Sequence, residues 1–268
     1  MREIWWNGKF IPSPTSPPFL EDSGLLFGEG LFETVKVREG RACFLQSHIN
    51  RLLTSSEELS LSLPLSREEL LAGIQGILER GKVKEGVMRI FLTPGNLYLT
   101  LHKGLPYTGK KSFRVTFSDF PRNEESPLVR HKVMSFFENR LARQEAQKKG
   151  FEEAIFLNRK GELTEGAFSN LFLVKEDLVL TPPLGSGILP GIIRGEIIRL
   201  GEEMGIPVRE KILRPEDLKE SREIFLTSSL MGVMPVREVE GWFQGEQFPL
   251  TLRLREALLK KEESTLFP

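Results

Sequence analysis

A glycine and proline turn that leads into a helix is the first feature of this sequence that could bind a ligand. Residues 187–194 read Gly-Ile-Leu-Pro-Gly-Ile-Ile-Arg, and apolar residues then recur at three- and four-residue steps up to Met204. Pro190 suits a first helical turn, and Gly205 supplies the stop. The free N–H groups at such a helix start attract an anion, although most helices that begin this way bind nothing.

Three polar features could act together with this helix start. Residues 227–229, Thr-Ser-Ser, follow an expected strand and offer N–H and O–H donors to an anion. Glu165 stands at an expected strand end among small and apolar residues, where a buried carboxylate needs a partner; a surface acid at a turn is the alternative. Arg51 lies on or beside the apolar side of an expected helix, where an arginine either packs as a structural residue or forks onto a phosphate.

The elements that position these residues follow from the hydrophobic periodicity. In the first half we expect a hairpin over 3–11 that turns at Asn7-Gly8, a stiff connector over 12–18, a glycine loop and strand over 24–37, strands over 42–45, 86–93, 97–102 and 112–118, and helices over 46–60 and 66–80. In the second half we expect strands over 154–157, 161–165, 170–174, 178–181, 206–211, 224–227 and 233–239, and helices over 136–149, 192–204, 215–220 and 247–262.

A polar segment near the middle of the chain is expected to separate two domains. Residues 119–127 read Asp-Phe-Pro-Arg-Asn-Glu-Glu-Ser-Pro and have no apolar periodicity. This boundary gives a smaller N-terminal domain over 1–118 and a larger C-terminal domain over 128–268. Both combine helices and strands, so the fold class is α+β.

Composition excludes several functions. The 268 residues include 37 basic and 37 acidic side chains, so no overall basic field indicates nucleic acid. Cys43 is the only cysteine, and the three histidines show no metal-ligand spacing. No apolar stretch has the length of a membrane helix, and no signal peptide is recognisable. We expect a cytoplasmic protein that acts on a small molecule without a metal, a membrane or nucleic acid.

Several segments, taken in their order along the chain, resemble the fold-type IV, pyridoxal-phosphate-dependent enzymes of the class IV aminotransferase family. The resemblance covers nearly the whole chain and implies a C-terminal domain built on a mixed sheet or pseudo-barrel with helices, as in D-amino-acid aminotransferases. It also implies a homodimer. The matching segments are FGEGLFET (27–34), HINRL (48–52), Lys132 with NRLARQEA (139–146), LTEG (163–166) with SNLF (169–172), TPP (181–183), GILPGIIR (187–194) and MPV (234–236).

The resemblance implies catalytic roles for three residues. Lys132 would form the Schiff base with pyridoxal 5′-phosphate and then move the substrate's α-proton. Thr34 would assist proton transfer, as the threonine that the lyases of this family carry at that position. Glu165 would bind the pyridine nitrogen and keep it protonated, which makes the ring a better electron sink.

The resemblance also implies a phosphate-binding group. The backbone amides of Ile192 and Ile193 would hold the phosphate, with Arg51 and either Ser228 or Ser229 beside them. Many relatives have threonine where Ile193 stands, so one hydroxyl contact is missing from this chain.

Three activities within the family stay open. A lyase would split 4-amino-4-deoxychorismate into 4-aminobenzoate and pyruvate for folate synthesis, whereas a D-amino-acid or a branched-chain aminotransferase would exchange an amino group. Thr34 and residues 229–236, Ser-Leu-Met-Gly-Val-Met-Pro-Val, favour the lyase. Against it, Ser228 replaces the usual asparagine, and Pro94 stands where lyases and D-amino-acid aminotransferases commonly carry arginine.

Two residues are candidates for binding the substrate. Arg89 matches an arginine of the branched-chain enzymes and could bind a carboxylate, since a buried carboxylate needs a cation. Phe27 belongs to the glycine loop that could approach a ligand. We expect the lyase, with an aminotransferase or an enzyme of dual activity as the alternative.

Overall fold

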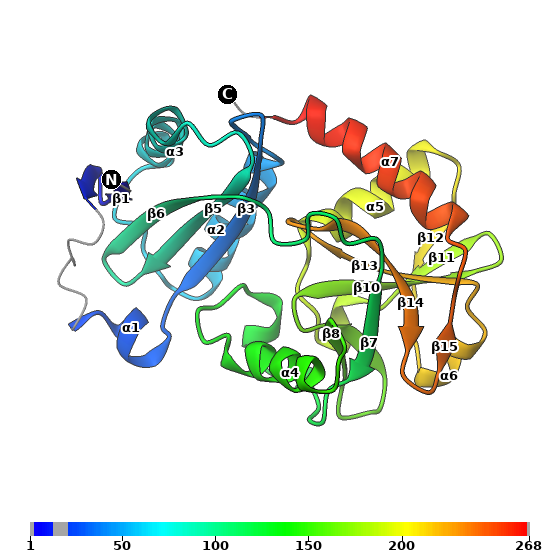
Figure 1. Ribbon diagram of the computed structural model, residues 1–268. Helices are drawn as coiled ribbons and strands as arrows, with labels where there is room; N and C mark the ends of the chain where they lie inside the picture. Colours follow the sequence, from blue (N-terminus) through cyan, green and yellow to red (C-terminus); the bar gives the residue numbers. More distant parts are fainter. Residues whose placement is uncertain (1–2, 13–20, 267–268) are drawn as a thin grey trace. The chain divides into compact units, whose positions relative to one another are not determined.

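The computed structural model describes residues 3–12 and 21–266 (Figure 1). The chain forms two compact units, and each is described by itself. The first unit consists of Met1–Pro106, His131–Phe136 and Glu262–Pro268, and the second of Tyr107–Arg130 and Phe137–Lys261. The connector expected over 12–18 falls almost entirely outside the described residues.

The first unit is built on a six-stranded sheet in the order β2-β1-β6-β5-β3-β4. Its strands are β1 (Glu3–Trp6), β2 (Lys9–Pro12), β3 (Leu31–Arg38), β4 (Arg41–Ala42), β5 (Gly86–Thr93) and β6 (Asn96–Lys103). Helices α2 (Leu45–Glu58) and α3 (Arg67–Gly81) pack against the sheet (Figure 1). Alternate residues of β3, including Leu31 and Val35, join Ile49 of α2 and Ile74 of α3 in one apolar core, so the other face of β3 can carry polar groups.

Local sequence signals account for most element boundaries in this unit. The hairpin turns at Asn7 and Gly8, both with positive φ, as expected. Helix α3 begins at a capping box in which Ser66 and Glu69 exchange hydrogen bonds. The strand expected over 42–45 is cut to two residues because Phe44, at φ 52°, turns the backbone into α2.

The glycine loop expected from residue 24 onward begins instead as a short helix. Helix α1 (Ser23–Phe27) is capped by the side chain of Asp22, which accepts a hydrogen bond from the N–H of Gly24. It ends at Gly28, whose φ of 71° is the left-handed conformation that favours glycine. The turn therefore sits directly before β3 and sets where that strand begins.

The second unit contains a closed barrel. Strands β10 (Ser169–Lys175), β13 (Glu223–Ser228), β14 (Gly232–Val239), β7 (Phe113–Phe117), β8 (Glu153–Leu157) and β9 (Leu163–Gly166) follow one another, and β9 also pairs with β10. Strands β11 (Leu178–Thr181) and β12 (Val208–Glu210) extend the sheet beyond β10, and β15 (Phe243–Gln244) pairs with β14. Both parallel and antiparallel pairs occur, which confirms the expected α+β fold with a mixed sheet and a pseudo-barrel.

Four helices accompany the barrel strands: α4 (Phe137–Lys148), α5 (Ile192–Glu203), α6 (Pro215–Lys219) and α7 (Pro249–Ser264). All were expected within a few residues of these bounds. Within the described ranges of the chain, none of the helices combines the length and the apolar character that a membrane crossing requires.

The division into units differs from the boundaries expected at residues 118 and 128. Strand β7 belongs to the second unit because it pairs with β8 and β14. Residues 131–136 belong to the first unit, where Val133 forms an antiparallel bridge with Leu31. The end of α7 also returns to the first unit through the buried Lys36–Glu262 ion pair, with Nζ and Oε2 2.8 Å apart. These pairings join residues far apart in sequence, so local composition does not reveal them.

Candidate active site

Lys132 lies on an extended segment beside β3 in the first unit. Its carbonyl accepts a hydrogen bond from the N–H of Phe32 at 2.8 Å, and Met134 donates to the carbonyl of Gly30 at the same distance. A Cβ on Gly30 would lie 2.6 Å from the carbonyl oxygen of Leu92, so this close approach requires glycine. The backbone of Lys132 is therefore held by the glycine-rich start of β3.

The amine of Lys132 lies among aromatic rings. Its Nζ is 4.4 Å from the ring centroid of Phe32 and 5.4 Å from that of Phe136. Aromatic faces attract an ammonium group and also limit its contact with water. Lys132 is half-buried in this setting, and its role as the Schiff-base lysine remains a prediction.

Thr34 and Arg89 are direct cross-strand neighbours on β3 and β5. Thr100 of β6 stands opposite Arg89 on the other side, so a cation lies between two hydroxyl-bearing residues. Phe32 is two residues before Thr34 and therefore shares its face of the strand. Arg89 is half-buried, and no ion pair with a carboxylate is found for it among the described residues; its expected binding of a substrate carboxylate remains a prediction.

Arg51 binds a carboxylate of its own unit. Its Nε and Nη2 each donate to Glu33 at 2.7 Å, and Nδ1 of His48 donates to the same carboxylate at 2.6 Å. Burial alone would raise the pKa of Glu33, but the charge of Arg51 and the hydrogen bonds outweigh it and hold that pKa well below 4.5. Burial lowers the pKa of His48, so its imidazole is neutral at pH 7. Sequence reasoning found Arg51 but missed this partner.

Phe27, the other candidate substrate contact of the first unit, ends α1 and is 77% exposed. Its neighbours Leu25 and Leu26 are also exposed. The structure thus places Phe27 on an apolar surface of α1, and its expected contact with substrate remains a prediction.

Glu165 lies in the second unit on the strand that closes the barrel. It is 7% exposed, which rules out the surface acid at a turn. Its Oε2 accepts hydrogen bonds from Asn170 Nδ2 at 3.2 Å and from the N–H of Leu189 at 3.0 Å. Its Oε1 accepts from Arg122 Nη2 at 3.4 Å. These donors come from three different segments and hold the carboxylate in place, and its expected contact with the pyridine nitrogen remains a prediction.

The start of α5 is joined to this carboxylate through Asn170. The side-chain amide of Asn170 also donates to the carbonyl of Leu189 at 3.0 Å. A Cβ on Gly191 would lie 1.9 Å from Asn170 Oδ1, so the chain needs glycine to pass here. The N-cap of α5 is Gly191, which has no side chain to accept from the first-turn amides, including those of Ile192 and Ile193.

Thr227 adds a buried donor on the next strand. Asn170 pairs with Glu165 on one side and with Thr227 on the other, so the three residues lie side by side on β9, β10 and β13. The hydroxyl of Thr227 is buried and has no hydrogen-bond partner within the described part of the chain. Ser228 follows, and its Oγ accepts a 3.4 Å hydrogen bond from the N–H of Met231. Ser229 comes directly after the strand.

These features fit pyridoxal phosphate. An uncapped helix start and an unpartnered buried hydroxyl suit a phosphate, because both offer donors that the protein leaves unused. A buried carboxylate suits a protonated pyridine nitrogen, because an anion stabilises a cationic N–H in a buried site. The expected residues of the second unit thus lie together, namely Glu165, Ile192, Ile193, Ser228 and Ser229. Lys132, Thr34 and Arg89 lie on neighbouring segments of the first unit.

Sequence reasoning missed two residues of the second unit that hold Glu165. Asn170 was visible only as part of the SNLF motif, and Arg122 lies in the polar segment expected to separate the domains. Asn139 of α4 accepts a hydrogen bond from Arg122 at 3.2 Å and donates to the carbonyl of Ala167 at 2.7 Å. Arg122 and Glu165 are 43 positions apart, so no periodic pattern could have paired them.

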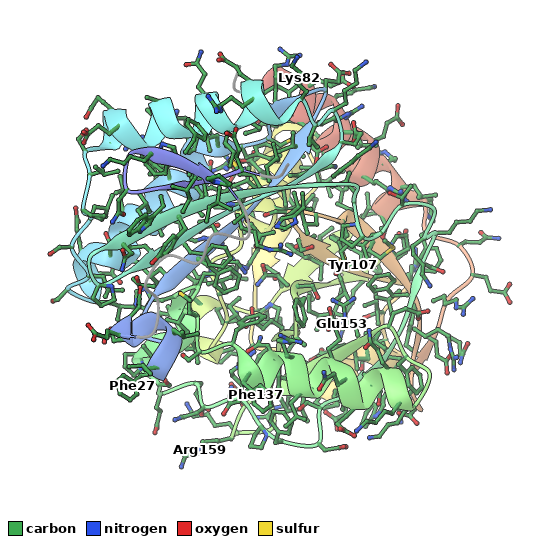
Figure 2. The ribbon with its side chains drawn as sticks, turned by 60° about the vertical axis from the view of Figure 1, so that its left-hand side comes forward. Phe27, Lys82, Tyr107, Phe137, Glu153 and Arg159 are labelled. Carbon is green, nitrogen blue, oxygen red and sulfur yellow. The ribbon has the colours of Figure 1, made fainter. Side chains whose placement is uncertain are left out.

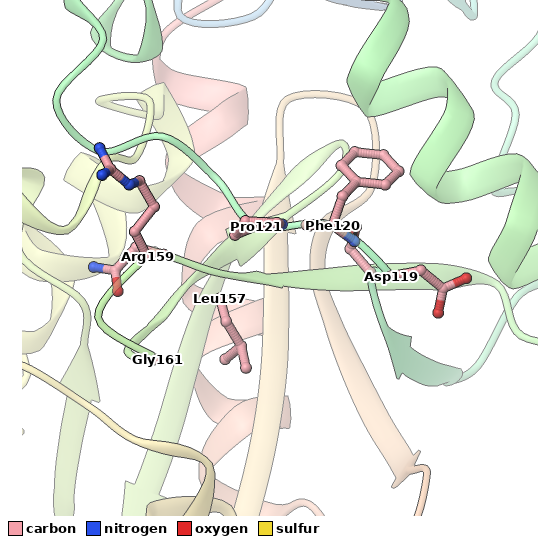
Figure 3. Close-up of a pocket in the computed structure, with 8 residues that line it drawn as sticks. Asp119, Phe120, Pro121, Leu157, Arg159 and Gly161 are labelled. Atoms are coloured by element: carbon pink, nitrogen blue, oxygen red, sulfur yellow. Dashed lines mark hydrogen bonds between the residues drawn. The ribbon is translucent and has the colours of Figure 1, made fainter.

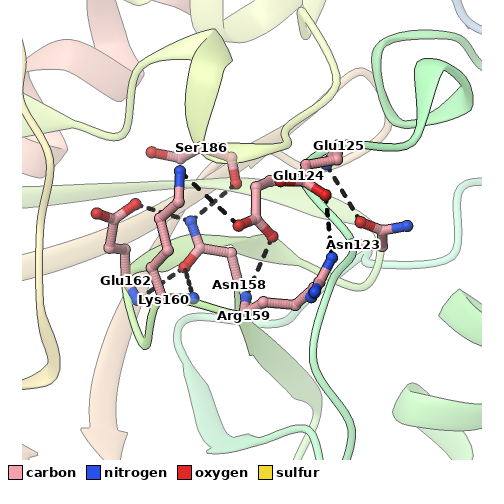
Figure 4. A network of polar contacts seen from close by, with 8 residues as sticks. All are labelled: Asn123, Glu124, Glu125, Asn158, Arg159, Lys160, Glu162 and Ser186. Carbon is pink, nitrogen blue, oxygen red and sulfur yellow. Dashed lines mark hydrogen bonds and ion pairs between the residues drawn. The ribbon is translucent and has the colours of Figure 1, made fainter.

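A polar network supports the segment that precedes α5. Asn158 is buried and donates from Nδ2 to Glu162 at 2.8 Å and to the carbonyl of Ser186 at 3.4 Å, while its Oδ1 accepts two backbone N–H groups (Figure 4). Glu124 accepts from the N–H of Arg159 in the same network. The network thereby joins the turn after β8 to the segment that leads into α5.

A shallow hollow lies beside this network, lined by residues 118–121 and by Leu157, Asn158, Arg159 and Gly161 (Figure 3). Its walls combine the ring of Phe120 with the charged side chains of Asp119 and Arg159. The residues expected to bind the cofactor do not line it.

Comparison with known proteins agrees with this geometry. Residues 30–239 match the family model described as amino-transferase class IV. A putative branched-chain-amino-acid aminotransferase of Methanocaldococcus jannaschii is 31% identical, over 89% of this chain and 88% of its own. A D-alanine aminotransferase of Bacillus licheniformis is 28% identical, over 96% of this chain and 95% of its own. The crystal structure of a putative 4-amino-4-deoxychorismate lyase from Legionella pneumophila aligns with a TM-score of 0.87 and 25% identity, over 94% of this chain and 98% of that one.

The chain belongs to the class IV aminotransferase family. It is a fold-type IV enzyme that uses pyridoxal phosphate and acts on small molecules.

Proposed function

We propose that this enzyme is a lyase that releases 4-aminobenzoate and pyruvate from 4-amino-4-deoxychorismate. The observation that carries the proposal is the pairing of Thr34 with Arg89 on the strand whose Phe32 ring contacts the Lys132 ammonium. A hydroxyl on the same strand face as Phe32 could relay a proton, and the arginine paired with it could bind one carboxylate of this dicarboxylate substrate. The similarity to the putative lyase of Legionella pneumophila supports the same activity.

The residues divide the work in the following way. The cofactor supplies an electron sink for the substrate's α-carbon. Lys132 holds the cofactor and its Nζ takes the α-proton, while the Thr34 hydroxyl passes a proton to the departing product. Glu165 accepts a hydrogen bond from the pyridine nitrogen. The amides of Ile192 and Ile193, together with Arg51, Ser228 and Ser229, bind the phosphate.

A second candidate is an aminotransferase, favoured by the 31% identity to a putative branched-chain enzyme. The turn between β5 and β6 also favours it. Thr93 pairs with Asn96 across Pro94 and Gly95, so this tight turn holds no arginine for a second carboxylate. A monocarboxylate amino acid would need only Arg89.

One experiment separates the two activities. The cofactor-loaded enzyme is given 4-amino-4-deoxychorismate without any 2-oxo acid, and 4-aminobenzoate and pyruvate are followed. A lyase forms both products in equal amounts over many turnovers, because it needs no amino acceptor. Lys132→Met is expected to reduce the rate by at least about a thousandfold and to remove the visible absorbance of the lysine-bound cofactor.

The opposite result is also informative. If no 4-aminobenzoate forms, while D-alanine or L-leucine converts the cofactor to its amine form and a 2-oxo acid restores it, the lyase proposal fails and the aminotransferase stands. Production of both sets of products by the wild type, and of neither by Lys132→Met, would show dual activity. We further propose a homodimer in the cytoplasm, as the resemblance and the sequence indicate.

A further inference from the structure

Arg122 is a buried cation in the second unit that the proposed mechanism does not use. It is 7% exposed, and its guanidinium lies 4.0 Å above the ring centroid of Phe156. Its N–H donates to the carbonyl of Leu157 at 2.8 Å, which attaches the segment after β7 to β8. Isolating a charge in this way is costly unless an anion balances it.

The anion that balances Arg122 is Glu165. Nη2 of Arg122 lies 3.4 Å from Oε1 of Glu165, and the two side chains are 8% and 9% exposed. Asn139 fixes the other terminal nitrogen, Nη1, at 3.2 Å. Nε is buried and has no hydrogen-bond partner within the described residues. The guanidinium of Arg122 thus lies over the ring of Phe156 and beside the amide of Asn139. Its Nη2 faces one oxygen of the Glu165 carboxylate.

The two oxygens of Glu165 consequently lie in different surroundings. Oε2 receives two uncharged donors, Asn170 Nδ2 and the N–H of Leu189, whereas Oε1 receives the charged one. An adjacent cation favours the ionised form of a carboxylate. Donors on both oxygens also fix the plane of the carboxylate, which sets the direction from which a further N–H can approach.

We propose that Arg122 is a positioning residue that fixes the orientation and the charge of Glu165 toward the pyridine nitrogen of the cofactor. The proposal rests on the role given to Glu165 in the proposed function. Arg122 acts through Glu165 alone, so its contribution to cofactor binding depends on that carboxylate. Asn139 contributes indirectly by holding the guanidinium in place.

The test is a double-mutant cycle on cofactor affinity. Apoprotein is titrated with pyridoxal phosphate and its dissociation constant is measured for the wild type, Arg122→Met, Glu165→Gln and the double variant. Arg122→Met is expected to weaken binding about tenfold in the wild-type background, a middle value for contacting buried pairs. In the Glu165→Gln background the same change is expected to have less than about a twofold effect, because its target is gone.

Arg143→Met is the matched control in the same unit. Arg143 also lies over an aromatic ring, 4.7 Å from the centroid of Phe168, and its Nε is also buried without a partner. Its Nη1 donates to the hydroxyl of Tyr107 at 3.0 Å, so it serves a different group. This variant should leave cofactor affinity within about twofold of the wild type, since Arg143 and Glu165 share no contact that would couple them.

Two variants keep the proposal testable if Arg122→Met does not fold. Arg122→Lys retains the charge but loses the planar fork that Phe156 and Asn139 hold, so its affinity should lie between those of the wild type and Arg122→Met. Asn139→Ala removes the amide that holds the Arg122 guanidinium. It should weaken pyridoxal phosphate binding less than Arg122→Met does. Intermediate affinities in both Arg122→Lys and Asn139→Ala support positioning through Glu165, whereas affinities equal to that of the wild type in both variants would contradict it.

Failure of this inference and failure of the proposed function give different results. If Arg122→Met weakens binding equally in both backgrounds, Arg122 acts on the fold and the inference is overturned. If Glu165→Gln alone changes neither the dissociation constant nor the visible spectrum of the bound cofactor, the role of Glu165 itself is wrong.

Discussion

Each unit of this enzyme buries a glutamate beside an arginine, and the two pairs differ in the length of their hydrogen bonds. Glu33, 1% exposed, accepts from Arg51 and His48 at 2.6 to 2.7 Å. Glu165, 7% exposed, accepts three donors at 3.0 to 3.4 Å. Each carboxylate accepts three of the described donors, but the bonds to Glu33 are short and charge-assisted, whereas those to Glu165 are longer and weaker.

The comparison teaches that burial and an arginine partner do not by themselves identify a binding site. Both carboxylates would be selected by a search for buried charged groups. The bond lengths separate them, because short charge-assisted bonds hold a carboxylate tightly in the fold, whereas a carboxylate held by longer bonds can adjust to a ligand. Three substitutions test this distinction.

Glu33→Gln is expected to have the largest effect, on stability. It leaves Arg51 buried without its anion and weakens the bond to His48, and breaking a buried pair in this way costs about 3–5 kcal/mol. Urea unfolding followed by circular dichroism measures the loss. The exposed Glu39→Gln, close by in the same unit, is the control and should change the free energy of unfolding little. If Glu33→Gln lowers the free energy of unfolding by less than about 1 kcal/mol, the structural role given to Glu33 is wrong.

Glu165→Gln is expected to act on turnover more than on stability. Gln cannot keep the pyridine nitrogen protonated, so kcat should fall about a hundredfold. The free energy of unfolding should fall by less than in Glu33→Gln, because the hydrogen bonds that are lost are longer, even though Arg122 is left without its anion. Steady-state kinetics and urea unfolding on the same preparation give both numbers. The distinction is wrong if Glu165→Gln unfolds as readily as Glu33→Gln while retaining its activity.

Glu153→Gln sharpens the comparison with a third buried glutamate, which lies at the start of β8 above α4 (Figure 2). Burial raises the pKa of Glu153 to about 7, although Arg143 and nearby backbone N–H groups oppose the rise. Because its pKa is raised on folding, Glu153 contributes stability that is complete below pH 4.5 and is lost as the pH rises through 7.

The expected difference between wild type and Glu153→Gln therefore depends on pH. Between pH 5 and pH 8 the wild type should lose about 2 kcal/mol of unfolding free energy relative to the variant. Urea unfolding at several pH values measures the difference, and other titrating groups cancel between the two proteins. Parallel stability profiles for the two proteins would show that Glu153 does not titrate in this range.

Elements whose boundaries depend on local chemistry could be predicted from the sequence. The Asn7-Gly8 hairpin, strand β5 and the capped start of α3 follow from turn residues, alternation and a capping box, all within a few positions. Glu165 and the start of α5 were found in the same way, because a strand end and a helix start have signals of their own.

The sequence could not predict long-range pairing. The place of β7 in the barrel depends on β14, more than a hundred residues later. The segment of Lys132 belongs to the first unit because Val133 bridges to Leu31. The pairing of Arg122 with Glu165 and the pairing of Glu33 with Arg51 also depend on how separate segments pack against each other. A short window of the sequence does not contain that information.

The close approach of Gly191 to Asn170 constrains how this chain can evolve. Any side chain at 191 would occupy the position of the Asn170 amide oxygen, and a larger group at 170 would displace the turn that contains Gly191. Neither position can change alone without disturbing the Leu189 contacts. Each residue therefore restricts what the other can be, and a chain that changes only one of them is expected to lose the cofactor before it loses the fold.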